Sequence, residues 1–189
     1  MVANSIGRRR PPMAEILKNG QVHNDNWQVL RPEAEADLAT VNLPAGQWLI
    51  PFALWQVQCA ALKSRSDIGV WLSPNDDLTE VAKHFSQWPL VAIDFPKFTD
   101  GRGYSIAWRI RNHYKYKGEL RAIGNVLVDQ LFFMLRVGFD TLALDPSVVV
   151  ATAERNLAPF PDTYQGSTDN PEPLFRRLDR TGAAQGGAH

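Results

Sequence analysis

The chain has 189 residues, of which 44% are hydrophobic and 21% charged, so it can bury the core of one domain and is too apolar for wholesale disorder. Twenty basic and twenty acidic residues cancel, which argues against a nucleic-acid-binding protein. The single cysteine excludes an intrachain disulfide.

The same composition bears on cofactors and location. With one cysteine, Cys59, and internal histidines that lie far apart, we expect no zinc, iron–sulfur cluster, haem or tightly bound flavin. No apolar run approaches the roughly 20 residues of a membrane-spanning helix. The arginines at 8–10 are not followed by the apolar segment of a signal peptide. We therefore expect a cytoplasmic protein that does not enter a membrane.

Residues 1–12 are expected to be a flexible extension, followed by one α/β domain over 13–158. Its first element is a small β-hairpin, because Asn19-Gly20 favours a tight turn between residues 15–18 and 21–23. Residues 27–30 could add a third strand.

From Gln47 onwards, short apolar runs alternate with segments of helical period, which predicts successive βα units and a mostly parallel sheet. The expected strands are 47–50, 68–72, 90–95, 119–123 and 139–144. The expected helices lie near 52–64, 77–87, 105–116, 126–137 and 146–157. The strand order stays open between a doubly wound sheet and an incomplete βα barrel, with the hairpin outside the sheet or at its edge.

Residues near the ends of these helices support the boundaries. Asp76 or Asp77 can cap the second helix, and Gly118 and Gly138 stand where helix ends need left-handed geometry. Asp145-Pro146 resembles a cap followed by proline in the first turn. Residues 159–189, rich in Pro, Gly, Asp and Arg, are expected to form a disordered tail.

The loop Asp94–Ser105 carries the candidate chemistry, because ligands of parallel α/β sheets bind beyond the carboxyl ends of the strands. Arg102, flanked by Gly101 and Gly103, offers a fork of donors that suits a carboxylate, a phosphate or a sulfur oxyanion. The amides near Ser105 at the following helix would support an anion. The predicted anion-binding residues are Lys97, Arg102, Tyr104, Ser105 and Arg121.

A purely structural interpretation of this loop carries equal weight. In it, Asp100 caps the helix, Arg102 pairs with Asp94, and Tyr104 packs against the fold.

A second polar set follows the loop. Glu119 and Arg121 lie on the same side of their strand, and an ion pair of Arg121 with Glu119 or Asp129 is the favoured explanation. The alternative is that Arg121 reaches the pocket of Arg102. The candidate catalytic carboxylates are Asp94, Asp100 and Asp129.

The runs FPKFTDGRGYSIAWRIR and GELRAIGNVLVDQLFFMLRVGFDTLAL resemble a bacterial family of unknown function that is often encoded beside assimilatory sulfite reductase. The resemblance covers about residues 13–157, and some members are labelled oxidoreductases. It implies a role in sulfur assimilation. It does not imply a redox cofactor, because the chain has no Gly-x-Gly-x-x-Gly motif after a strand and no cysteine cluster.

Two hypotheses follow, and whether the chain is an enzyme stays open between them. The first is an accessory protein of sulfate or sulfite reduction that binds a reductase partner, a small oxyanion or both. The second is an enzyme that acts on a small anion at the Asp94–Ser105 loop. The enzyme should have a concave pocket where Arg102, Arg121 and a carboxylate converge, whereas a docking protein should have an exposed apolar patch.

Overall fold

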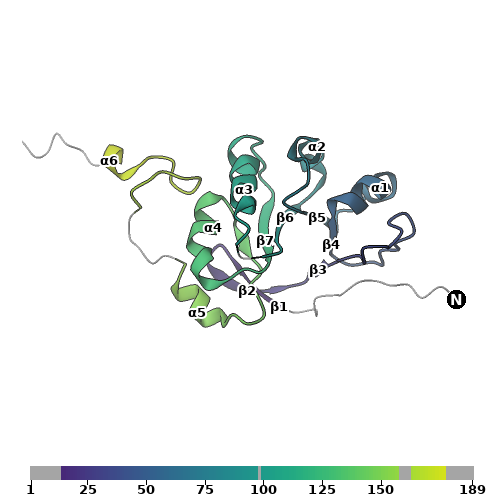
Figure 1. Ribbon diagram of the computed structural model, residues 1–189, viewed down its shortest axis with the longest axis horizontal. Coiled ribbons are helices and arrows are strands. Elements are labelled where there is room, and N and C mark those ends of the chain that lie inside the picture. Colours follow the sequence, from purple (N-terminus) through teal and green to yellow (C-terminus); the bar gives the residue numbers. More distant parts are fainter. Residues whose placement is uncertain (1–13, 98, 158–162, 178–189) are drawn as a thin grey trace, which may run out of the picture.

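A computed structural model describes residues 14–97, 99–157 and 163–177, and its core is one curled sheet of eight strands (Figure 1). The strand order is β2-β1-β8-β7-β6-β5-β4-β3. The strands are β1 (Ala14–Lys18), β2 (Gln21–Asp25), β3 (Gln28–Val29), β4 (Trp48–Pro51), β5 (Ile68–Leu72), β6 (Leu90–Phe95), β7 (Glu119–Gly124) and β8 (Thr141–Leu142).

The amino-terminal hairpin is part of this sheet. Asn19 and Gly20 both have positive φ and form the expected turn between β1 and β2. Strand β1 also pairs with β8, in the antiparallel direction. The sheet is therefore mixed, which corrects the mostly parallel sheet predicted from the sequence. The hairpin lies at its edge.

The other strands, β3 to β8, are parallel neighbours in chain order. Right-handed crossovers between consecutive neighbours place all connecting helices on one face. Figure 1 shows α1 to α4 side by side along that face, so the fold is a half-barrel and not a doubly wound sheet. The helices are α1 (Phe52–Leu62), α2 (Leu78–Ala82), α3 (Arg102–Asn112), α4 (Leu131–Val137), α5 (Val150–Arg155) and α6 (Leu174–Arg177), with 3₁₀ turns η1 (Phe85–Gln87) and η2 (Val128–Gln130).

A two-residue link forces the sheet to curl. Strands β2 and β3 are its opposite edges, yet Asn26 and Trp27 alone connect them. Eight flat strands would place the edges roughly 34 Å apart, at about 4.8 Å per step. The three Cα steps from Asp25 to Gln28 reach only about 11 Å. The edges must therefore approach one another at this link.

The two faces of the sheet have separate cores. The face under the helices packs the larger cluster, with Trp48, Ile50 and Trp55 among its buried members. The concave face buries a smaller cluster, and Trp27 and Trp71 pack against it. Its buried members are Ile16, Val29, Leu49, Leu90, Ala92, Ile123 and Ala143.

Two of the predicted helix ends are confirmed. The Asp77 carboxylate accepts a hydrogen bond from the Thr79 amide at 2.9 Å and caps α2. Gly138 ends α4 with a φ of +115°, a left-handed conformation that glycine adopts without strain.

Two other predicted ends are wrong. Helix α3 ends at Asn112, and in the loop that follows it is Lys115, at φ +56°, and not Gly118, that takes the left-handed conformation. Asp145 does not cap a helix, because α5 begins only at Val150. The Asp145 carboxylate instead accepts from the Ser147 amide and hydroxyl, which closes a local turn.

Part of the segment expected as a tail packs against the domain. The Ser167 hydroxyl and the Thr168 amide donate to the Arg136 carbonyl at the end of α4, at 2.7 and 3.0 Å. The Asn112 side chain on α3 donates to the Thr168 hydroxyl. These bonds hold residues 165–170 against α3 and α4. The expected extension 1–12 and the ranges 158–162 and 178–189 lie outside the described residues.

Candidate functional site

Asp94, near the carboxyl end of β6, faces the concave side and binds Arg31. The Arg31 guanidinium donates to both carboxylate oxygens, at 2.6 and 3.0 Å, and lies 5.2 Å from the centre of the Trp71 ring. The indole of Trp71 in turn donates to the Leu30 carbonyl. Asp94 is thus paired with an arginine that precedes the parallel strands β4 to β8, and not with Arg102.

Arg102 is exposed at the start of α3, and its donors are directed at neighbouring side chains. Two of them bind the Asp100 carboxylate, at 2.7 and 2.9 Å, and a third binds the Asn75 side-chain oxygen at 2.7 Å. The Asp100 carboxylate also accepts from the Arg102 amide. These hydrogen bonds lower the pKa of Asp100, so this carboxyl favours its charged form.

Of the two glycines beside Arg102, Gly103 has a packing role. A Cβ on Gly103 would stand 2.6 Å from the Phe95 ring and 3.2 Å from Ile93, so Gly103 lets α3 approach β6 closely. A Cβ on Gly101 would only touch the Tyr104 ring at 4.0 Å, and its φ of −75° is ordinary. The close approach predicted for these glycines therefore occurs only at Gly103, where α3 packs on β6.

Arg121 lies away from Arg102, on the opposite face of the sheet. Its side chain is 2% exposed and binds both oxygens of Asp25, at 2.9 and 3.0 Å, and Glu119 at 2.7 Å. Burial alone would raise the pKa of Glu119, but the charges of Arg121 and Lys18 overcome it and lower that pKa. The predicted Glu119–Arg121 pair is confirmed, and the proposed convergence with Arg102 is absent.

The remaining predicted residues lie apart from that pair. Lys97 is exposed, and its carbonyl accepts from the Asp100 amide. Ser105 is exposed within α3, which begins at Arg102 and not at Ser105 as predicted. Asp129 is exposed in η2. The pKa of Tyr104 is raised, mainly because the Tyr104 side chain is partly buried and also because of the nearby charge of Asp129.

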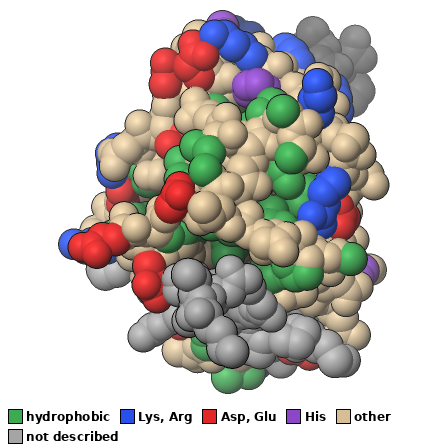
Figure 2. All heavy atoms as spheres, turned by 90° about the vertical axis from the view of Figure 1, so that its right-hand side faces the viewer, with side chains coloured by type: hydrophobic (Ala, Val, Ile, Leu, Met, Phe, Trp, Pro, Cys, Tyr) green, Lys and Arg blue, Asp and Glu red, His purple; other side chains and the backbone are tan. Residues whose placement is uncertain are grey.

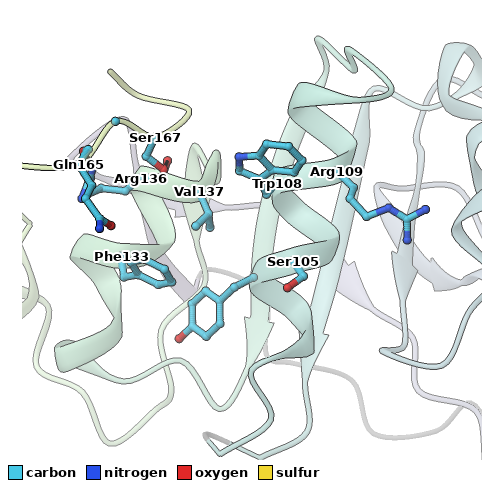
Figure 3. A pocket seen from close by; sticks show the side chains of 10 residues that line it. Ser105, Trp108, Arg109, Phe133, Arg136, Val137, Gln165 and Ser167 are labelled. Atoms are coloured by element: carbon cyan, nitrogen blue, oxygen red, sulfur yellow. Dashed lines mark hydrogen bonds between the residues drawn. The ribbon is translucent and has the colours of Figure 1, made fainter. Parts of the chain in front are cut away.

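An exposed apolar groove lies between α3 and α4 (Figure 3), and Tyr104 and Ser105 are among the residues that line it. Trp108 on α3 and Phe133 on α4 are 48% and 50% exposed, although both are large and apolar. Phe133 also contacts Tyr104, with ring centres 5.2 Å apart. The groove encloses about 360 Å³.

The carboxyl-terminal segment forms one wall of this groove. Gln165, Gly166 and Ser167 line it, and Arg136 binds the Gln165 carbonyl and lies 3.6 Å from Asp169. In Figure 3 the Trp108 ring points from α3 towards this wall, while the side chain of Arg109, which also lines the groove, extends from α3 in the opposite direction. The groove is therefore a composite of two helices and the docked segment.

Other parts of the surface differ from the groove. On the face that Figure 2 shows, hydrophobic side chains are exposed in small areas separated by polar and charged surface.

No helix among the described residues is long and apolar enough to cross a membrane. Within those residues, no three His, Cys, Asp or Glu side chains are grouped so that they could hold a metal ion.

The matched family region contains both the loop and the groove. A family model described as a bacterial protein of unknown function, DUF934, matches residues 69–175, more than half of the chain. The chain belongs to the DUF934 family. The DUF934 match begins within β5 and extends to α6, so it includes the docked segment that walls the groove. No curated protein and no solved structure matches the chain significantly.

Sequence reasoning missed two features of this region. Arg31, the partner of Asp94, lies in a stretch without periodic pattern, and nothing local marks it as a neighbour of β6. The exposure of Trp108 and Phe133 was also missed, because helical period alone does not reveal which aromatic residues lack a covering element. One signal was available: Trp108 is followed by Arg109, and both are turned away from the helix face that carries the buried residues Gly103, Ala107 and Ile110.

Proposed function

We propose that this protein is an accessory factor of assimilatory sulfate or sulfite reduction that binds a reductase partner through the groove between α3 and α4. The metabolic setting rests on the resemblance to a family encoded beside assimilatory sulfite reductase. The observation that carries the binding mode is the half-exposed pair Trp108 and Phe133.

Large exposed aromatic residues in a groove are typical of protein-binding sites, where a partner's apolar side chain fills the space between them. Here the space is about 360 Å³, enough for one or two such side chains and bordered by the polar Gln165 and Ser167. A few buried anchors inside a polar rim are the usual arrangement of such an interface.

Charge indicates the kind of partner surface. Residues 101–118, which include α3, contain Arg102, Arg109, Arg111, Lys115 and Lys117 and no acidic residue. Arg102 and Arg111 are paired with Asp100 and Asp140. Arg109 is exposed and lines the groove, whereas Lys115 and Lys117 are exposed beyond the end of α3. An apolar projection surrounded by acidic side chains would complement this surface.

The test is the binding of purified assimilatory sulfite reductase to the full chain by titration calorimetry. Trp108→Ser and Phe133→Ser should each weaken binding by about 2 kcal/mol or more, roughly thirtyfold. Val57→Ser is the matched control, because Val57 is 53% exposed on α1, away from the groove. The groove is rejected as the binding site if Val57→Ser also loses binding, or if both groove variants bind as tightly as the unaltered chain. Absence of binding by the unaltered chain would reject this partner.

The alternative function, an enzyme acting on a small anion at the Asp94–Ser105 loop, has one supporting observation. The Arg102–Asn75 bond joins the start of α3 to the loop after β5, near the carboxyl ends of β5 and β6, where ligands of parallel sheets bind. Arg102→Ala should then abolish sulfite binding and leave the unfolding midpoint within about 2 °C. Unchanged sulfite binding in this variant would eliminate the loop as the site.

A further inference from the structure

A second hollow lies on the α2 side of α3, apart from the groove, and encloses about 520 Å³. It is lined by the residues around η1 and by the loop between α3 and β7, none of which carries a carboxylate. The lining residues are Ala82, Phe85, Ser86, Trp88, Tyr114, Lys115, Tyr116, Lys117 and Gly118. We call it the Tyr114 pocket.

We propose that the Tyr114 pocket binds a small organic anion that carries a planar ring, such as a nucleoside monophosphate or an aromatic carboxylate. This inference is independent of the groove and of the reductase partner. It rests on three properties of the pocket: its charge, its aromatic floor and the rigidity of the loop that forms it.

The charge of the pocket is positive and not neutralised within its walls. Lys115 and Lys117 are both exposed at its border. The nearby Lys83 differs, since it forms an ion pair with Glu80 at 2.6 Å. Two ammonium groups beside a hollow without carboxylates attract a phosphate or carboxylate, which they bind as point charges.

The floor of the pocket is aromatic. The Phe85 ring lies 5.8 Å from that of Tyr114, 5.2 Å from that of Tyr116 and 6.3 Å from that of Trp88, centre to centre. Phe85, Trp88 and Tyr116 are nearly buried, while Tyr114 is partly exposed and offers its ring to a ligand. A planar ring can pack on such a surface, whereas a simple inorganic anion gains nothing from it.

The loop that carries both lysines is held in place before any ligand arrives. Arg111 donates to the Tyr116 and Gly118 carbonyls, each at 2.8 Å, and the Tyr116 hydroxyl donates to the Trp88 carbonyl at 3.0 Å. Gly118 permits this arrangement, because a Cβ there would stand 2.2 Å from the Tyr116 hydroxyl. A preformed loop loses little conformational entropy when it binds a ligand.

Lys115 also occupies an unusual backbone conformation. Its φ of +56° lies in the left-handed region, which costs a lysine more than it would cost a glycine or an asparagine. That conformation places a charged side chain at the border of the pocket, at a position where turn geometry alone would favour glycine.

The experiment is a calorimetric titration of the full chain with AMP, UMP and 4-hydroxybenzoate, with adenosine and inorganic phosphate as half-ligands. At least one of the three ring-bearing anions should bind, and adenosine and phosphate should each bind about tenfold more weakly than it. The paired substitutions Lys115→Gln and Lys117→Gln should weaken its binding by about tenfold, and Tyr114→Leu should weaken it as well. Lys63→Gln, an exposed lysine after α1, should leave it unchanged.

Several outcomes would overturn the proposal. It fails if none of the three anions binds saturably up to about 5 mM. It fails equally if the lysine variant binds as tightly as the unaltered chain, or if phosphate binds as tightly as AMP. Binding of an Asp/Glu-rich peptide without binding of any small anion would assign the surface to a protein partner instead. A circular-dichroism spectrum of each variant verifies that the fold is retained.

Discussion

Arg121 in the middle of the sheet and Asp25 at its edge form a buried ion pair across the concave face, although 96 residues separate them in the chain. The side chains of Arg121 and Asp25 are 2% and 1% exposed. The pair therefore ties the amino-terminal hairpin to the centre of the half-barrel.

Removing one partner of this pair should destabilise the fold strongly. Arg121→Met leaves the carboxylates of Asp25 and Glu119 without their buried counter-charge, and such losses cost about 3–5 kcal/mol. Lys18→Met is the control, because Lys18 is 41% exposed and pairs with Glu119, so its loss should cost about 1 kcal/mol or less. Urea denaturation measures both, and equal effects of the two variants would contradict the assigned role of Arg121.

Gly103→Ala should destabilise the packing of α3 on β6. The added Cβ would meet the Phe95 ring at 2.6 Å, and overpacking of this kind costs about 1–3 kcal/mol. Gly101→Ala, two residues earlier, would add a Cβ in ordinary contact with the Tyr104 ring at 4.0 Å and should cost less than about 1 kcal/mol. The comparison is made on unfolding midpoints in urea, and a smaller effect at Gly103 than at Gly101 would show that α3 shifts to accommodate the methyl group.

Asp76 should make the protein less stable as the pH rises. Burial raises the pKa of Asp76 above its usual value of 3.8, and the hydrogen bond from the Ser73 amide only partly offsets this. The folded state then binds the proton more tightly than the unfolded state. This contribution is full below pH 3.8 and is lost as the pH rises through the raised pKa.

Asp76→Asn keeps an acceptor for Ser73 but cannot ionise. The unfolding free energy of this variant, measured against pH, should lack that decline, and at pH 7 it should equal or exceed that of the unaltered chain. A steeper decline in the variant would contradict the direction of the shift.

Arg31→Ala should leave Asp94 without its ion pair. The Asp94 side chain is only 9% exposed, so an unpaired carboxylate there should cost about 1–3 kcal/mol. The double variant Arg31→Ala with Asp94→Asn should recover part of this loss, because the amide carries no charge to desolvate. If the double variant is no more stable than Arg31→Ala, the loss came from the stacking of Arg31 on Trp71.

The sequence predicted the elements of this fold better than their assembly. Strand runs such as 68–72 and 90–95 are long, apolar and bounded by turns, so local pattern defined them well. The antiparallel pairing of β1 with β8 joins residues more than a hundred positions apart, and no local pattern contains that information. The late start of α5 reflects Asp145, which closes a turn on Ser147 where the sequence also allowed a helix cap.

For the candidate site, too, the sequence predicted local geometry but not which distant residues would come together. Period two correctly placed Glu119 and Arg121 together on one side of β7, but it could not tell which face of the sheet α3 would cover. That single unknown separated Arg121 from Arg102. Arg121 pairs with Asp25 and Asp94 pairs with Arg31. Both partners lie in the first 31 residues, for which the sequence predicted no contact with the parallel sheet.

The pairing of β1 with β8 also has a consequence for synthesis of the chain. The hairpin is synthesised before its neighbour β8, which follows more than a hundred residues later. Until Thr141 and Leu142 emerge, one edge of β1 has no strand to pair with, and exposed strand edges favour association between chains. Nascent chains that stall before residue 141 should therefore be the species that most needs a chaperone.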